Sequence, residues 1–221
     1  MPVNSSAVLE ARGLSHGYQK GDLLFEDLSL RVAAGQRVVL VGPSGCGKST
    51  FAKVLAGYLE ASSGEVIFDR EPIFTGKTVR KKRGERGPYP IQLIYQHPEE
   101  AVNPRWKLRQ TLNEAWDPPA DFFEQIGIQS QWLDRYPREL SGGELQRFCI
   151  ARALAPETRF LIADEISTML DVLTQAQMWG FILAELKRRN MGLLAITHDL
   201  ELAKRIGTSI IKFEDLVGKA V

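Results

Sequence analysis

The sequence predicts an α/β fold with a mostly parallel core sheet, an N-terminal antiparallel β part and an inserted helical subdomain. Three observations predict it. Short strand patterns open the chain, strand and helix patterns alternate towards its end, and a mainly helical stretch occupies about residues 100–155. Strands that alternate with helices favour a parallel sheet, because each parallel connection needs a crossover. With 221 residues and 44% apolar content, one domain over residues 1–221 is expected.

The N-terminal part contains three short strand patterns, at Val8–Leu14, Leu28–Val32 and Gln36–Val41. Apolar and polar residues alternate in the second of them, as in a strand with one buried face. A glycine-rich stretch follows, and then a helical pattern begins. Its apolar residues recur at i, i+3, i+4, i+7 and i+8, which is one face of a helix: Phe51, Val54, Leu55, Tyr58 and Leu59.

The second half of the chain combines the helical subdomain with further strands. The helical stretch runs from Asn103 to about Ala155 and is broken at residues 118–119, 137 and 141–143 by proline or glycine. The patterns outside it are a strand at Ile91–Tyr95, a strand at Phe160–Ala163, a helix at Thr174–Arg189 and a buried strand at Leu193–Thr197.

Charge and cysteine content argue against a nucleic-acid-binding protein, a cysteine metal site and a disulfide-rich scaffold. Lys and Arg number 28 against 27 Asp and Glu, so the balance does not favour nucleic acid as the main partner. The most basic patch, Arg80–Arg83 with Arg86, lies among glycines and prolines and is expected to be a solvated loop. Cys46 and Cys149 lack metal-ligand or disulfide spacing, which fits a reducing compartment.

Neither end of the chain suggests an additional module. Residues 1–10 lack the basic start and apolar run of a secretory leader, and no segment approaches the roughly 20 apolar residues of a membrane span. After His198 only residues 199–221 follow, too few for a regulatory domain. Any membrane association is therefore expected to come through another protein.

The run Gly42-Pro43-Ser44-Gly45-Cys46-Gly47-Lys48-Ser49 is a complete phosphate-binding P-loop, placed between a strand and a helix as that motif requires. Its backbone N–H groups and the following helix N-terminus attract phosphate oxygens. Lys48 is expected to bridge phosphates, and the Ser49 hydroxyl to bind Mg²⁺. The predicted nucleotide-binding residues here are Gly42, Pro43, Ser44, Gly45, Cys46, Gly47, Lys48, Ser49 and Thr50.

An apolar strand ends in the two carboxylates Asp164 and Glu165. Next to a P-loop, the first is expected to face the Mg²⁺ shell. The second can reach a water molecule aligned with the γ-phosphate. These residues predict a nucleoside triphosphatase.

Leu140-Ser141-Gly142-Gly143-Glu144 opens a helix with a serine and two glycines, which forms a second anion cradle. One nucleotide has no use for a second cradle within the same chain, so a second subunit is expected. At these residues the sequence resembles the ABC ATPase family, of which Leu-Ser-Gly-Gly is the signature. The resemblance implies that Ser141, Gly142 and Gly143 close on a nucleotide held by the P-loop of another chain.

The resemblance covers nearly the whole chain and implies further roles. Gln96 matches the glutamine that senses Mg²⁺ and the attacking water, and His198 matches the histidine that contacts the γ-phosphate. Tyr18 matches the aromatic residue that stacks on adenine. Asp171 matches the aspartate of the loop at the dimer contact and is counted with the signature residues as nucleotide-binding. The cofactors implied are ATP and Mg²⁺. The catalytic residues implied are Glu165, His198 and Gln96, and those implied for the metal are Ser49, Gln96 and Asp164.

Two residues depart from the family pattern. Ile166 replaces the usual proline after the catalytic glutamate, and Met169 occupies a position that is normally small. Because Asp171 is retained, we expect a working dimer contact with altered packing. An unlike ATPase partner would suit this asymmetry, although a homodimer stays open.

A narrower resemblance lies in Gln96-His97-Pro98 followed by Asn103-Pro104-Arg105-Trp106, which is similar to importers of peptides, nickel and metal chelates. It implies membrane permease subunits, a second ATPase chain and, indirectly, a solute-binding protein, with this chain at the cytoplasmic face of the membrane. An unrelated ABC importer remains the alternative. A soluble ABC ATPase acting on DNA or ribosomes is disfavoured by the single cassette, and a non-hydrolytic regulator by the presence of Lys48 and Glu165.

Overall fold

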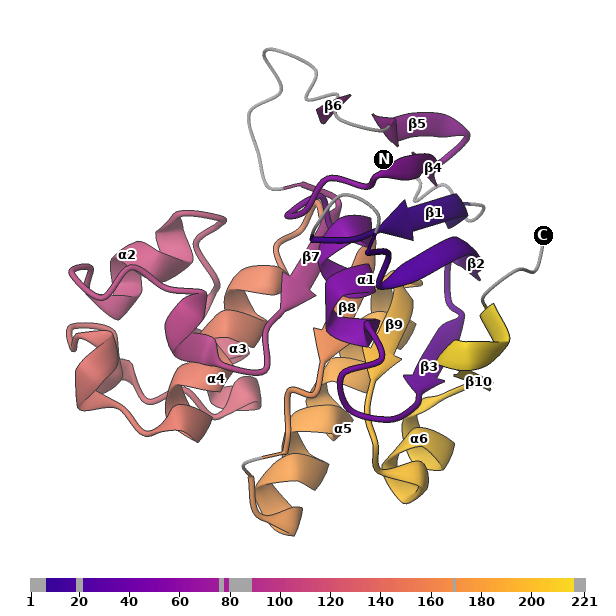
Figure 1. Ribbon diagram of the computed structural model, residues 1–221. Helices are drawn as coiled ribbons and strands as arrows, with labels where there is room; N and C mark the ends of the chain where they lie inside the picture. The colour runs from indigo at the N-terminus through magenta and orange to yellow at the C-terminus, as the bar shows by residue number, and fades with distance from the viewer. Residues whose placement is uncertain (1–6, 19–21, 76–77, 80–88, 169, 217–221) are drawn as a thin grey trace.

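The computed structural model describes residues 7–18, 22–75, 78–79, 89–168 and 170–216. Met169 and the basic stretch Arg80–Arg83 with Arg86 lie outside the described residues. In Figure 1 an antiparallel sheet lies above the parallel strands, and a group of helices stands to one side. The predicted α/β class with its three parts is therefore confirmed.

The antiparallel sheet has the strand order β2-β1-β4-β5-β6. Its first two strands contain the predicted N-terminal patterns and extend beyond them, and β1 pairs on its other side with β4. The later strands of this sheet were not predicted. The strands are β1 (Val8–His16), β2 (Phe25–Ala33), β4 (Ser63–Phe68), β5 (Glu71–Thr75) and β6 (Thr78–Val79).

The parallel sheet has the order β10-β3-β9-β8-β7, and each adjacent pair runs parallel. Val38 and Leu40 of β3 pack in the core shared with the antiparallel sheet, while Val39 and Val41 pack in the core on the helical side. Burial of both faces explains the continuous apolar runs of these strands. The strands are β3 (Arg37–Val41), β7 (Ile91–Ile94), β8 (Phe160–Asp164), β9 (Gly192–Ile196) and β10 (Ser209–Lys212).

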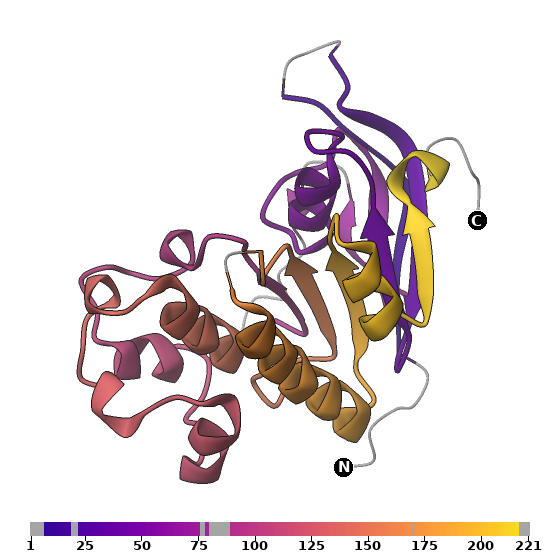
Figure 2. The same ribbon diagram turned by 90° about the horizontal axis from the view of Figure 1, so that it is seen from below.

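The helical subdomain lies in the stretch where helices were predicted. It contains α2 (Leu108–Asn113), α3 (Ala120–Ile126), α4 (Gly142–Ala153) and the short 3₁₀ turns η1 (Pro98–Glu100), η2 (Ser130–Trp132) and η3 (Pro137–Glu139). Helix α3 begins directly after the prolines at 118–119. The break predicted at 141–143 was wrong for its glycines, because Ser141 caps α4 and Gly142 and Gly143 form its first turn. Figure 2 shows these helices beside the long helix α5 (Val172–Arg189). The chain then forms α6 (Leu200–Ile206), which was not predicted, and the turn η4 (Phe213–Leu216).

Helix α1 (Lys48–Leu55) is shorter than the sequence pattern predicted. Gly57 has a φ of 77°, a left-handed conformation that ends helices, and the N–H of Tyr58 turns back to the carbonyl of Lys53. Tyr58 and Leu59 therefore follow the helix, and their assignment to its apolar face was wrong. Across the described residues, every helix falls short of what crossing a lipid bilayer would require.

Candidate active site

Four segments that carry the predicted site residues meet at one edge of the parallel sheet. Strands β3, β9, β8 and β7 are hydrogen-bonded neighbours that run in the same direction. Their carboxyl ends therefore lie together, as in other open α/β sheets where ligands bind at this edge. The segments that follow these ends contain the P-loop, His198, Asp164 with Glu165, and Gln96.

The P-loop leads from β3 directly into α1. Gly45 and Gly47 have φ values of 80° and 107°, which only glycine adopts without strain, so they allow the tight turn before the helix. The buried Lys48 donates from Nζ to the carbonyl oxygens of Gly42 at 2.9 Å and Pro43 at 2.6 Å. Phosphate oxygens that reach Lys48 would compete with these carbonyls for the ammonium group.

Ser49 and Asp164 join the P-loop helix to the end of β8. The Ser49 hydroxyl donates to Oδ1 of Asp164 at 3.0 Å, and Asp164 is only 4% exposed. Burial raises the pKa of Asp164, and the hydrogen bond from Ser49 acts in the opposite direction. A buried carboxylate beside a hydroxyl is an oxygen donor set of the kind that Mg²⁺ prefers, so these residues fit the ion.

The carboxylate of Glu165 lies between two other predicted site residues. Gln96 approaches it with Nε2 at 3.4 Å from Oε2, and His198 with Nδ1 at 3.5 Å from Oε1. Glu165 also has a φ of 48°, a left-handed conformation that costs a residue with a side chain about 1 kcal/mol or more. The surrounding structure holds this conformation, with the N–H of Glu165 bonded to the carbonyl of Ile196.

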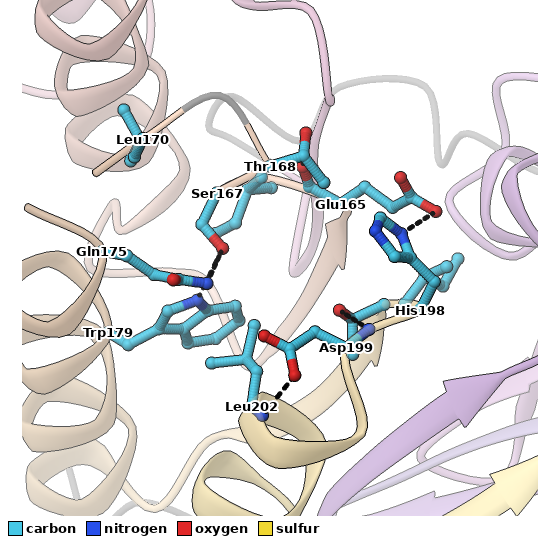
Figure 3. Close-up of a pocket in the computed structure, with 12 residues that line it drawn as sticks. Glu165, Ser167, Thr168, Leu170, Gln175, Trp179, His198, Asp199 and Leu202 are labelled. Atoms are coloured by element: carbon cyan, nitrogen blue, oxygen red, sulfur yellow. Dashed lines mark hydrogen bonds and ion pairs between the residues drawn. The ribbon is translucent and has the colours of Figure 1, made fainter. Parts of the chain in front are cut away.

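A small cavity of about 150 Å³ opens beside Glu165 and His198 (Figure 3). On its far side Ser167 accepts hydrogen bonds from Gln175 at 2.9 Å and from the Trp179 indole at 3.2 Å. These bonds fix the start of the loop after Glu165 to helix α5. The cavity has a partly polar lining and room for several water molecules next to the carboxylate.

Tyr18 presents an exposed ring near the start of α1. Its hydroxyl lies 3.0 Å from Oγ1 of Thr50, and its ring meets the buried ring of His16 edge to face at 5.2 Å. His16 is fixed in turn by a hydrogen bond between Nδ1 and the carbonyl of Glu60. The contacts with Thr50 and His16 hold the Tyr18 side chain in place. Because Tyr18 is still 71% exposed, one face of its ring stays open for a flat ligand ring.

The signature residues form the N-terminus of α4 and face solvent. Ser141 caps the helix by accepting from the N–H of Glu144, while both its own N–H and its hydroxyl donate to Oε2 of Glu144 at 2.8 and 2.9 Å. A phosphate bound here would compete with that carboxylate for Ser141. A Cβ at Gly143 would meet the Leu170 side chain at 2.8 Å, so glycine permits the first turn of α4 to pack close to Leu170.

Asp171 and Ile166 both have clear structural roles. Asp171 caps α5, accepting from the N–H groups of Leu173 and Thr174 and from the hydroxyl of Thr174. These bonds, chiefly the hydroxyl bond from Thr174, lower the pKa of Asp171. Ile166 is buried in the core on the helical side. The nucleotide contact expected for Asp171 stays a prediction.

The contacts therefore bring most predicted residues into linked groups. The P-loop residues, Asp164, Glu165, Gln96 and His198 lie at one edge, with Tyr18 attached through Thr50. Ser141 bonds instead within its own helical turn. Sequence reasoning missed His16, whose ring meets Tyr18, and Gln146 in α4, which is buried although Arg147 follows it directly.

Comparison with known families matches residues 25–168 to the model described as ABC transporter. Among curated proteins, the chain is 37% identical over 198 residues to the oligopeptide transport ATP-binding protein OppF of Bacillus subtilis, covering 84% of this chain. This chain spans 64% of the length of that OppF protein. It is 33% identical over 218 residues to the nickel import ATP-binding protein NikE of Escherichia coli, covering 90% of this chain and 80% of NikE.

Solved structures share the fold. A dimeric ATP-binding cassette in a post-hydrolysis state bound to ADP and Pi matches with a TM-score of 0.76 and 22% identity over 96% of this chain and 97% of that chain. The cbiO1 protein of Clostridium perfringens, part of the ABC transporter complex cbiONQ, matches with a TM-score of 0.73 and 22% identity, covering 94% of this chain and 84% of that one.

Proposed function

Since this chain belongs to the ABC transporter family, we propose that it is the ATP-binding subunit of a transporter and hydrolyses ATP to drive import of a small solute through partner permeases. The observation that carries this proposal is the placement of Glu165. Its carboxylate is held between Gln96 and His198, one residue after the Asp164 that bonds the P-loop serine.

The chemistry follows from that arrangement. The P-loop and Lys48 hold the phosphates, and a water oxygen attacks the γ-phosphorus while the bond to the β–γ bridging oxygen breaks. Glu165 takes the proton that this water loses. His198 and Gln96 approach the carboxylate from two sides and keep it in place.

Ser49 and Asp164, with Gln96 nearby, are the residues that would hold Mg²⁺. When bound, the ion neutralises charge on the phosphate oxygens. Among the described residues no group of three or more His, Cys, Asp or Glu side chains is arranged to hold a metal ion. An ion with so few protein ligands suits Mg²⁺, which commonly shares its coordination between one or two carboxylates and substrate phosphates.

The proposal includes a second ATPase subunit whose nucleotide is closed by Ser141, Gly142 and Gly143. Ser141 faces solvent at the start of α4, which supports a role towards another chain. Val172 and Leu173, at the start of α5, are 77% and 68% exposed. Apolar side chains this exposed next to the Asp171 loop are suited to burial against a protein partner.

The membrane partner is expected at a groove of about 470 Å³ beside the segment that leads to Gln96. Its lining combines Tyr58 and Tyr95, whose rings meet edge to face, with Glu100, Glu114 and Arg152. Aromatic and charged groups of this kind suit a permease segment that reaches the cytoplasmic face of the membrane. A partner bound here would lie next to Gln96 and could sense or shift its position.

The cargo we propose is a peptide, nickel or a metal chelate. The Asn103-Pro104-Arg105 stretch and the likeness to OppF and NikE support this class of solute. A solute-binding protein would deliver the cargo to the permeases.

The function is tested by measuring phosphate release from ATP by a complex of this chain with candidate permease subunits and a second ATPase subunit. Replacing Glu165 with Gln should keep ATP affinity and lower turnover by about a hundredfold or more, because the variant has no base. Glu201→Gln, at an exposed position on α6, is the matched control and should retain the parent rate. If the Glu165→Gln complex turns over ATP like the parent, the proposed role of Glu165 is wrong.

A further inference from the structure

Gln146 is a buried amide that has one hydrogen bond where it has capacity for more. Its side chain is 2% exposed, and Nε2 donates to the carbonyl oxygen of Tyr95 at 3.1 Å. Because a carbonyl can only accept, the amide nitrogen must face Tyr95. In the described part of the chain, Oε1 is then left buried without a hydrogen-bond partner. An orphaned acceptor lowers stability, so packing alone does not explain a glutamine here.

Cys149 holds the same segment at its other end. It follows Gln146 by one helical turn, which places both side chains on one side of α4. Its buried Sγ lies 3.7 Å from the carbonyl oxygen of Pro98, at the distance of a weak S–H hydrogen bond. Tyr95 and Pro98 flank Gln96, so α4 holds the short segment that carries Gln96 from both sides.

This segment connects two parts of the proposed active site. Gln96 approaches the carboxylate of Glu165 at 3.4 Å, while α4 begins at the cap formed by Ser141. A helix moves as a unit when its N-terminus is pulled or turned. Through Gln146, a displacement of the signature end of α4 would shift the Tyr95 carbonyl and therefore the side chain of Gln96.

We propose that Gln146 is a positioning residue that fixes Gln96 beside Glu165 and links the phosphate cradle at Ser141 to the catalytic carboxylate. This inference rests on the proposed function, since the position of Gln96 matters only if Glu165 acts on ATP. Glutamine is long enough to reach the Tyr95 carbonyl and donate to it. The same side chain leaves Oε1 unpaired, and the resulting loss of stability accompanies the positioning role.

The test is Gln146→Met, which keeps the length of the side chain and removes its donor and its unpaired acceptor. In the assembled complex, kcat should fall about tenfold with KM for ATP unchanged, because a slightly misplaced catalytic group slows the chemical step. The melting temperature should stay close to that of the parent, because the variant removes the unpaired Oε1 but also leaves the Tyr95 carbonyl oxygen without its donor. Gln125→Met, exposed on α3 of the same subdomain, is the control and should leave kcat unchanged.

A double variant separates positioning from a general structural effect. If Gln146 acts through Gln96, then Gln96→Ala and Gln96→Ala with Gln146→Met should have the same kcat. Losses that multiply in the double variant, or a parent-like kcat for Gln146→Met alone, would overturn the inference.

A second measurement does not depend on hydrolysis. In the isolated chain, Gln146→Met should speed amide hydrogen exchange at residues 95–97, while Gln125→Met should leave it unchanged. Equal exchange in Gln146→Met and the parent would overturn the inference even if the chain proved inactive. Failure of the proposed function would appear separately, as a parent complex that does not release phosphate from ATP.

Discussion

The hydroxyl of Ser49 donates a 3.0 Å hydrogen bond to Oδ1 of Asp164, so the first turn of α1 and the end of β8 are joined directly. Two oxygen ligands are thereby brought together at the sheet edge where the P-loop lies. The carboxylate is buried there, and burial raises the pKa of Asp164. A buried carboxylate of this kind is typical of a group that binds a cation, because the cation offsets the cost of removing the carboxylate from water.

Replacing Asp164 with Asn should separate metal binding from nucleotide binding. Asn keeps an acceptor for Ser49, so the variant should fold, and its melting temperature should equal or exceed that of the parent because no buried charge remains. Mg²⁺ should no longer strengthen ATP binding, whereas in EDTA parent and variant should bind ATP equally. ATP titrations with Mg²⁺ and with EDTA measure this. A variant that still gains parent-like affinity from Mg²⁺ would contradict the assignment.

Tyr18 should contribute to ATP affinity through its ring. Tyr18→Ala should weaken ATP binding about tenfold, since stacking on a base is worth about 1–3 kcal/mol. Tyr18→Phe retains the ring and loses only the bond to Thr50, so its affinity should stay within about threefold of the parent, given that one hydrogen bond contributes little net. Inorganic tripolyphosphate, which has no base, should bind the parent and Tyr18→Ala alike. Equal loss of tripolyphosphate binding would point to a damaged P-loop instead.

The two cysteines should differ sharply in reactivity. Burial raises the pKa of Cys149 to about 11, so at pH 8 only about 0.1% of it is thiolate. Cys46 is partly exposed in the P-loop. A maleimide should therefore modify Cys46 first, and saturating ATP should slow that reaction. Mass spectrometry of the labelled chain measures both effects, and Cys46→Ser should remain unlabelled until it unfolds. Rapid modification of Cys149 in the folded chain would contradict its burial.

Much of the site could be predicted because its residues follow buried strands. Strands that are apolar on both faces, such as Val38–Val41, identify a parallel sheet, and parallel strands end at one edge. The order of the P-loop, Gln96, Asp164 and His198 along the chain then predicts that they meet. In the structure Ser49 bonds Asp164, and Gln96 and His198 both approach Glu165, while the roles of these residues stay predictions.

Other features depend on tertiary contacts that local patterns do not contain. The apolar face read from Phe51 to Leu59 continues past α1, but the left-handed Gly57 ends the helix, and Tyr58 packs against Tyr95 instead. Gln146 and Cys149 bond to the carbonyl groups of Tyr95 and Pro98, and each of these partners lies 51 residues earlier in the chain. No periodicity of α4 identifies a backbone acceptor in another segment.

The chain alone should be a poor ATPase. Its Ile166 is buried in the core, and its Met169, which lies outside the described residues, is expected at the dimer contact, where the family resemblance implies a small residue. Two such loops facing each other could crowd, and overpacking costs about 1–3 kcal/mol. That is about 5-fold to 150-fold in the affinity of a homodimer. Turnover of the isolated chain should therefore rise when a second, unlike ATPase chain is added. Full ATPase activity of this chain with the permeases alone would contradict this expectation.

The most direct test of the account is the mass in solution of the Glu165→Gln chain, measured by light scattering with and without ATP. We predict that it stays a single chain when alone, and that ATP converts it to a complex of two chains when an unlike second ATPase subunit is present. Lys48→Ala in this chain, together with the corresponding lysine change in the partner's P-loop, should prevent this, because neither P-loop then holds the nucleotide that the opposite cradle closes on. A tight ATP-dependent homodimer, or chains that remain single while the parent pair hydrolyses ATP at its full rate, would contradict the account.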